Sequence, residues 1–258
     1  MTPLLNPKSL PFLDHLGPIP FAHRGGAGMF PENTMPAFQN AVDMGYEYLE
    51  TDVHASKDGK VFAFHDDSLD RVTGHIGKIS NLTAKEISKI KNSGFAKIPT
   101  LSELLETFPE VKINIDPKAD SVVIPLINLL KHTNSVNRVC IGSFSDKRIR
   151  QIRKELGPGL CVSAGPKSVM KFLTGKFRFS KSKPDYHCLQ VPQRSGPVKI
   201  ITHDFVNRAH LKGLQVHVWT VDDPKEMSEL LDLGVDGLMT DEPAILKNVL
   251  LERDEWTK

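Results

Sequence analysis

Short apolar runs rich in β-branched residues alternate with amphipathic segments through most of the chain, and this alternation restricts the fold more than any other feature. It is typical of a parallel sheet whose strands are joined by helical crossovers. The predicted strands cover 20–23, 47–53, 111–116, 138–143, 160–164, 187–191, 214–220 and 236–240. Eight strand–helix units in a chain of about 250 residues are typical of a barrel. We therefore expect an α/β fold, a (β/α)8 barrel of the TIM type.

Two helix starts are marked by capping boxes, which supports the predicted crossovers. Thr83 is followed three residues later by Glu86, and Thr100 in the same way by Glu103. In such a pair each side chain satisfies a backbone N–H group at the start of the helix. We expect helices to begin at both places.

One strand-like run, residues 60–65, does not fit the alternation. It follows the second predicted strand after the turn 56–59, whose Asp-Gly pair is a strong hairpin signal. We interpret residues 54–82 as an insertion on the barrel rim, within the second strand–helix unit. Because no linker or internal repeat divides the chain, we predict one domain over 19–252, preceded by an N-terminal extension of residues 1–18.

Charge and composition indicate which partners and which cellular compartment to expect. With 33 basic and 31 acidic residues the net charge is +2, which is too small to indicate binding to nucleic acid. Cys140, Cys161 and Cys188 lie far apart in sequence without a zinc-binding spacing, so we interpret them as buried thiols of a reducing compartment. The first residues do not resemble a signal peptide, and no apolar stretch is long enough to predict a transmembrane segment. We expect a cytoplasmic protein.

Glu50 and Asp52 stand two residues apart on the second predicted strand, which places both carboxylates on the same face. Two carboxylates buried this close together repel each other, so a buried pair needs a cation or a shared proton. Oxygen ligands favour a hard divalent cation, Ca²⁺ or Mg²⁺. A solvent-facing pair at a strand end is the alternative, and the spacing alone leaves both open.

Two histidines stand at the ends of predicted strands. His23 and Arg24 end the first strand, and His65 ends the rim hairpin. A histidine transfers protons near neutral pH, and an arginine offers a forked donor that suits phosphate oxygens. If the hairpin folds over the barrel mouth, the two histidines could serve as the acid and the base of phosphodiester cleavage. A structural role for the His-Arg pair is the alternative.

Further candidates lie at other predicted strand ends. Asp116 is a possible third metal ligand and Lys118 a possible phosphate contact, unless they form only a surface ion pair worth at most about 1 kcal/mol. Phe144, Gln190 and Trp219 are expected to line the mouth, although a tryptophan there fits a core position nearly as well.

Residues 167–183 combine six basic side chains with interleaved phenylalanines and contain no acidic residue. This composition is compatible with weak contact with an anionic lipid surface. The alternative is a solvated basic face, which is what a run of charge usually forms.

Ordered motifs span the chain from about residue 19 to 250. They are His23-Arg24-Gly25, Pro31-Glu32-Asn33-Thr34, Glu50-Thr51-Asp52, Lys57-Asp58-Gly59, His65-Asp66 with Leu69 and Arg71, Val218-Trp219-Thr220-Val221, Gly234-Val235-Asp236-Gly237 and Thr240-Asp241. In this order they resemble the glycerophosphodiester phosphodiesterase family.

The resemblance implies a (β/α)8 barrel with an insertion in its second unit. It also implies hydrolysis of a small-molecule glycerophosphodiester to glycerol 3-phosphate and an alcohol, with one divalent cation. The site residues that it implies are the metal ligands Glu50 and Asp52, the acid–base pair His23 and His65, the phosphate contacts Arg24 and Lys118, and Glu32 as a support of the first loop.

One position departs from the family pattern. Many members carry glutamate as the third ligand, where this chain has Asp116. Together with His54, this aspartate resembles the subgroup related to lysophospholipase D enzymes, which shifts the prediction toward lipid-like substrates. The alternatives are thus a lysophospholipase D and a non-catalytic phosphate- or lipid-binding barrel. The intact set of histidines and carboxylates argues against the second.

Overall fold

The computed structural model describes residues 10–175 and 184–257. Eight parallel strands follow one another around a barrel in the order β8–β7–β6–β2–β1–β13–β12–β9. Backbone hydrogen bonds from Ala164 N to Cys188 O and from His187 N to Val162 O, each 2.9 Å, connect β8 to β9 and close the ring. The barrel strands are β1 (Ile19–Ala22), β2 (Tyr48–Ala55), β6 (Lys112–Pro117), β7 (Val139–Ile141), β8 (Cys161–Val162), β9 (Cys188–Pro192), β12 (Gln215–Trp219) and β13 (Gly237–Thr240). The predicted TIM-type barrel is confirmed.

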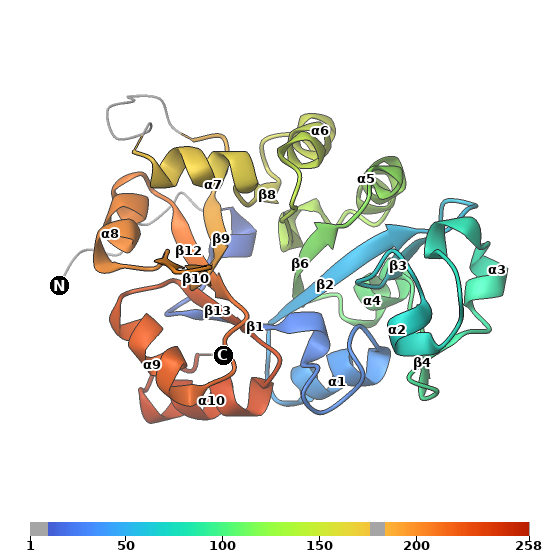
Figure 1. Ribbon diagram of the computed structural model, residues 1–258, viewed down its shortest axis with the longest axis horizontal. Helices are drawn as coiled ribbons and strands as arrows, with labels where there is room; N and C mark the ends of the chain where they lie inside the picture. The colour runs from blue at the N-terminus through green and yellow to red at the C-terminus, as the bar shows by residue number, and fades with distance from the viewer. Residues whose placement is uncertain (1–9, 176–183, 258) are drawn as a thin grey trace.

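Each barrel strand is followed by a helix that packs outside the ring (Figure 1). These helices are α1 (Met35–Asp43), α4 (Leu101–Thr107), α5 (Val123–His132), α6 (Asp146–Leu156), α7 (Pro166–Leu173), α8 (His203–Leu211), α9 (Pro224–Asp232) and α10 (Pro243–Glu252). Both predicted capping boxes are present: Thr100 caps α4 with Glu103, and Thr83 caps α3 (Ala84–Ile87) with Glu86.

The insertion between β2 and α4 is longer than the predicted 54–82, since it reaches the start of α4 at residue 101. It contains β3 (Val61–Ala63), α2 (Asp70–Thr73), the 3-10 turn η3 (Ile79–Asn81), α3, and the short pair β4 (Lys91–Asn92) and β5 (Ala96–Lys97). A small core of its own holds it together, formed by Phe62, Phe64, Leu69, Ile79, Ile87 and Ile98. Because β3 runs antiparallel to β2, the insertion is anchored directly on the barrel.

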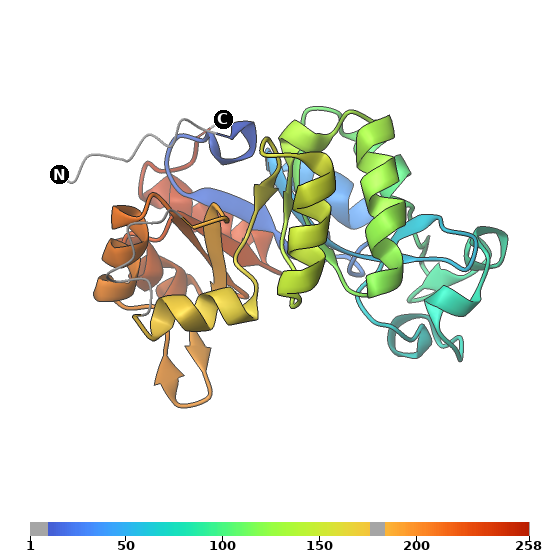
Figure 2. The ribbon, with the colours of Figure 1, turned by 90° about the horizontal axis from the view of Figure 1, so that it is seen from above.

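A second excursion, which the sequence pattern did not predict, follows β9. It is the antiparallel hairpin of β10 (Arg194–Ser195) and β11 (Val198–Lys199). The hairpin projects from the body of the molecule beside α7 (Figure 2). The insertion and this hairpin lie on opposite sides of the barrel, as Figure 1 shows.

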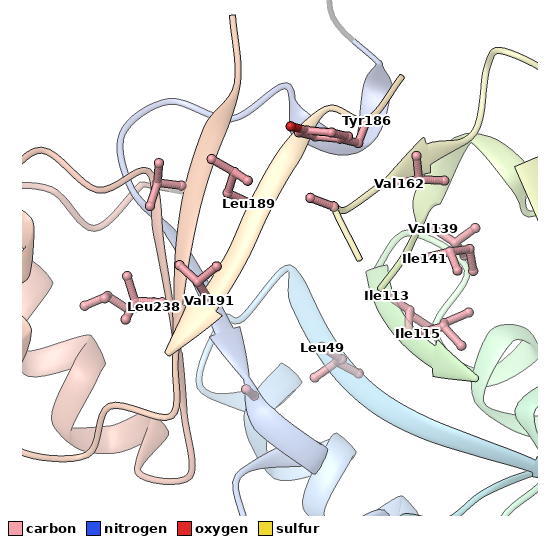
Figure 3. Packing of buried hydrophobic residues seen from close by; sticks show 14 of the residues in the cluster. Leu49, Ile113, Ile115, Val139, Ile141, Val162, Tyr186, Leu189, Val191 and Leu238 are labelled. Atoms are coloured by element: carbon pink, nitrogen blue, oxygen red, sulfur yellow. The ribbon is translucent and has the colours of Figure 1, made fainter. Parts of the chain in front are cut away.

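Two apolar layers stabilise the barrel. The outer layer lies between strands and helices, and strand residues such as Leu49, Ile113 and Ile141 belong to it (Figure 3). The inner layer fills the amino-terminal end of the barrel and includes Phe12 and Tyr48, both 0% exposed. Full burial of one such side chain contributes about 1.5–3 kcal/mol. The described part of the N-terminal extension therefore closes the bottom of the barrel.

Across the described residues, the helices are too short or too polar to cross a membrane.

Candidate active site

A cavity of about 780 Å³ opens at the carboxyl ends of the barrel strands. Active sites of (β/α)8 barrels lie at this end, where the loops after the strands meet. Ten of the predicted site residues line the cavity: His23, Arg24, Glu50, Asp52, His65, Asp116, Lys118, Phe144, Gln190 and Trp219. Glu32 is not among the lining residues but contacts Arg24 from behind.

The carboxylates meet because of strand register. β2 and β6 pair in parallel with Asp52 opposite Asp116, and Glu50 lies two residues earlier on the same face of β2. Glu50 is 4% exposed and Asp52 is 3% exposed. The solvent-facing alternative for this pair is therefore wrong.

Burial and repulsion perturb both carboxyl groups. Burial, followed by the charge of Asp52, raises the pKa of Glu50 to about 7. Burial alone would also raise the pKa of Asp52, but the cations Lys118 and Arg24 outweigh it, so that this pKa lies below its usual range. Asp52 is thus a stable anion, whereas Glu50 needs additional positive charge to ionise fully at neutral pH.

Lys118 lies between two of the carboxylates. Its Nζ is 2.9 Å from Asp52 Oδ1 and 3.1 Å from Asp116 Oδ2. Burial raises the pKa of Asp116, and its Oδ1 is buried without a hydrogen-bond partner. An unpartnered carboxylate oxygen in the same cavity as Glu50 and Asp52 suits a hard cation, because such ions take oxygen ligands. Glu50, Asp52 and Asp116 are therefore candidate ligands for one.

His23 occupies the 3-10 turn η2 (His23–Gly25), directly after β1. Its Nδ1 donates to Asp241 Oδ1 at 2.7 Å, and its Nε2 lies 3.8 Å from Glu50 Oε2. Burial would lower the pKa of His23, but Glu50 and Asp241 outweigh this effect and raise it. Asp241 follows β13, which pairs with β1, and its role was not predicted although it belongs to a recognised motif.

His65 follows β3 and reaches the cavity because the hairpin folds back along β2. Its Nδ1 donates to Asp66 Oδ1 at 2.5 Å, and its backbone carbonyl accepts a hydrogen bond from His54 Nε2 at 3.1 Å. The insertion thus brings a second histidine, oriented by its own carboxylate, to the same cavity as His23.

Glu32 connects the first loop to the insertion. Its Oε1 accepts hydrogen bonds from Arg24 Nη1 at 3.1 Å and from Arg71 Nη2 at 2.6 Å. Arg71 also donates to Asp66, the partner of His65. The network therefore joins Arg24 in the first loop to Asp66, the partner of His65. Support of the first loop by Glu32 stays a prediction.

The opposite wall of the cavity is apolar, and most of it was not predicted. Helix α7 contributes Val169, Met170 and Leu173, and the hairpin contributes Val198 with Ile200 just after it. Met170 is 57% exposed and Val198 is 61% exposed, so this wall is open to solvent. An exposed apolar surface next to a site indicates an apolar ligand.

The predicted mouth residues complete the cavity. The rings of Phe144 and Trp219 meet edge to face, with centroids 5.7 Å apart, next to the apolar wall. On the floor, Gln190 Nε2 donates to Asn114 Oδ1 at 2.8 Å. Asn114, which lies opposite Glu50 on β6, is a further lining residue that the sequence reasoning missed.

A family model described as the glycerophosphoryl diester phosphodiesterase family matches residues 23–245. The chain belongs to this family. A relative from Mycobacterium tuberculosis, named probable glycerophosphodiester phosphodiesterase 2, is 40% identical over 251 residues and covers 95% of both chains. The human lysophospholipase D GDPD1 is 29% identical over 269 residues, which are 89% of this chain and 85% of that protein.

Solved structures of the family share the barrel. One is an Oleispira antarctica phosphodiesterase in complex with the product sn-glycerol-3-phosphate. It has a TM-score of 0.75 and 23% identity, and the match covers 91% of this chain and 97% of that one.

Proposed function

We propose that the protein hydrolyses glycerophosphodiesters to glycerol 3-phosphate and an alcohol. One observation carries this proposal: two histidines, three carboxylates and two cationic side chains line a single cavity at the carboxyl end of a barrel. The family membership supports it, and so does the relative that was solved with sn-glycerol-3-phosphate. A non-catalytic barrel would not need both histidines held by carboxylate partners.

The charged wall suits a phosphodiester. Arg24 and Lys118 would bind the non-bridging phosphate oxygens, with Lys118 exchanging part of its pairing to Asp52 and Asp116 for the phosphate. His23 and His65 would accept the proton of the attacking hydroxyl and donate one to the leaving alkoxide. Asp241 and Asp66, bonded to their Nδ1 atoms, fix the imidazoles so that each presents Nε2 to the substrate.

Glu50, Asp52 and Asp116 would hold one divalent cation, Ca²⁺ or Mg²⁺. When bound, such an ion supplies positive charge to the phosphate and acidifies a bound hydroxyl. Its presence would also favour the ionised form of Glu50, whose pKa is raised to about 7.

A second candidate is lysophospholipase D activity on acylated diesters, and the apolar wall is the specific observation in its favour. A glycerol and a small head group do not need Val169, Met170, Leu173 and Val198, whereas an acyl chain would pack on them. The human relative named lysophospholipase D points the same way.

Parallel assays with glycerophosphocholine and lysophosphatidylcholine separate the two functions. Release of glycerol 3-phosphate from the first substrate, with higher kcat/KM than release of lysophosphatidic acid from the second, supports the primary proposal. A clear preference for the acylated substrate would replace it by the second.

The predicted contact with an anionic lipid surface stays a prediction. Residues 176–183 of that segment lie outside the described residues. The remainder lies on and just after α7, where Lys167 and Lys171 are exposed next to Met170. Basic residues beside an exposed apolar side chain are compatible with such a contact.

A further inference from the structure

The three cysteines, far apart in sequence, meet inside the barrel. Cys140 on β7, Cys161 on β8 and Cys188 on β9 are at most 1% exposed and belong to the inner apolar layer. Their sulfur atoms all lie within 4.8 Å of one another, and those of Cys140 and Cys188 are 4.0 Å apart. They are free thiols rather than disulfides, since a disulfide requires sulfurs about 2 Å apart.

Strand register produces this cluster. Cys140 and Cys161 are paired residues on β7 and β8, and Cys188 bridges to Ser163, two residues after Cys161. All three side chains point inward from neighbouring strands, so the sulfurs lie below the floor of the cavity that Gln190 and Ser163 help to form. This layer has no part in the proposed hydrolysis.

We propose that Cys140, Cys161 and Cys188 form a buried site for a thiophilic metal ion of the Zn²⁺ class. In a tetrahedral zinc site the Zn–S bonds are about 2.3 Å, which places the sulfurs about 3.8 Å apart. The separation of 4.0 Å between the sulfurs of Cys140 and Cys188 is close to this value, and all three sulfurs lie within 4.8 Å of one another. Sulfur ligands select such ions over Ca²⁺ or Mg²⁺.

His217 on β12 is buried near Cys188, but its ring nitrogens pair with other groups. Its Nε2 donates to Gln215 Oε1 at 3.0 Å, and its Nδ1 accepts from Gln190 Nε2 at 3.4 Å. The three sulfur atoms therefore make up the proposed site.

The test uses Co²⁺, because thiolate–cobalt bonds give an intense near-ultraviolet charge-transfer band that oxygen ligands do not give. Wild-type protein is expressed in zinc-depleted, cobalt-supplemented medium, since the buried ligands would take up metal while the barrel folds. It is then washed with EDTA to empty the cavity at the mouth. We expect one cobalt ion per chain, measured by mass spectrometry, together with the charge-transfer band. Wild-type protein without the band and without metal overturns the proposal.

Matched variants assign the metal to its ligands. Cys140→Ala should lose the band and the bound ion while retaining the circular dichroism of the wild type. Asp52→Asn, on the carboxylate side, should retain both, which separates this site from the proposed hydrolysis. If Cys140→Ala does not fold, Cys161→Ser takes its place: it should also lose the band and the bound ion. The metal content of the wild type is interpreted independently of either variant. A band that persists in a folded cysteine variant, or that disappears in Asp52→Asn, contradicts the assignment.

Discussion

The two walls of the cavity differ in both composition and origin. The first half of the barrel and its insertion provide the charged wall, with His23, Glu50, Asp52, His65 and Lys118. The second half provides the apolar wall from α7, the β10–β11 hairpin and β12. The comparison indicates a division of labour, in which the first half performs proton transfer and phosphate binding. The second half would determine how large and how apolar the substrate can be.

The largest effect is expected on the charged wall. His23→Ala and His65→Ala should each lower kcat by about 10²–10⁴-fold, since positioned acid–base groups contribute this much. The loss should be the same for glycerophosphocholine and lysophosphatidylcholine, because both carry the same phosphodiester. Isothermal titration should show metal binding intact in both variants. Loss of metal binding in His65→Ala would mean that His65 is a metal ligand, which contradicts its assignment as an acid–base group.

The charge of that wall also predicts how the metal-free protein responds to pH. In the folded protein Glu50, with its pKa raised to about 7, keeps a proton that the unfolded chain releases near 4.5. Between these values the unfolded state binds fewer protons, so the free energy of unfolding should fall as the pH rises, by up to about 3 kcal/mol.

Urea unfolding in EDTA at pH 5 and pH 7.5 measures this slope. The variant Glu50→Gln cannot titrate at this position, so its free energy of unfolding should change less between the two pH values. Saturating Ca²⁺ or Mg²⁺ should have the same effect in the wild type. An equal slope in wild type and Glu50→Gln would assign the effect to other groups.

A smaller effect is expected for Asp241, which contacts His23 but does not line the cavity. Asp241→Asn removes the carboxylate at 2.7 Å from His23 Nδ1 and should lower kcat by about 10-fold, the cost of losing one charged hydrogen bond. Because Asp241 helps to raise the pKa of His23, the pH profile should also shift to lower pH. A lower kcat with an unchanged pH profile would mean that Asp241 has only a structural role.

The smallest effect is expected on the apolar wall. Val198→Asp should lower kcat/KM for lysophosphatidylcholine about fivefold more than for glycerophosphocholine, since about 1 kcal/mol of apolar contact is lost. Leu211→Asp is the matched control, because Leu211 is 84% exposed on α8 and does not line the cavity. Equal losses on both substrates would mean that this wall does not bind an acyl chain.

Much of the charged wall could be predicted from sequence, and little of the apolar wall could. Strand alternation predicted the barrel, and the two-residue spacing of Glu50 and Asp52 placed both on one face. The β10–β11 hairpin was missed because its strands are two residues each and hold Gly196 and Pro197 between them.

Contacts between distant strands escaped prediction for another reason. Asp241 meets His23 only because β13 pairs with β1, and the three cysteines meet only because β7, β8 and β9 are in register. Barrel closure and register are tertiary properties, so local spacing carries no information about them.

The most direct test of the charged wall is glycerol 3-phosphate release from glycerophosphocholine by exhaustively chelated wild-type protein, before and after addition of Ca²⁺ or Mg²⁺. If Glu50, Asp52 and Asp116 hold a catalytic cation, chelation abolishes the activity, either ion restores it, and Asp52→Asn is not restored. Full activity in the chelated protein would contradict this account.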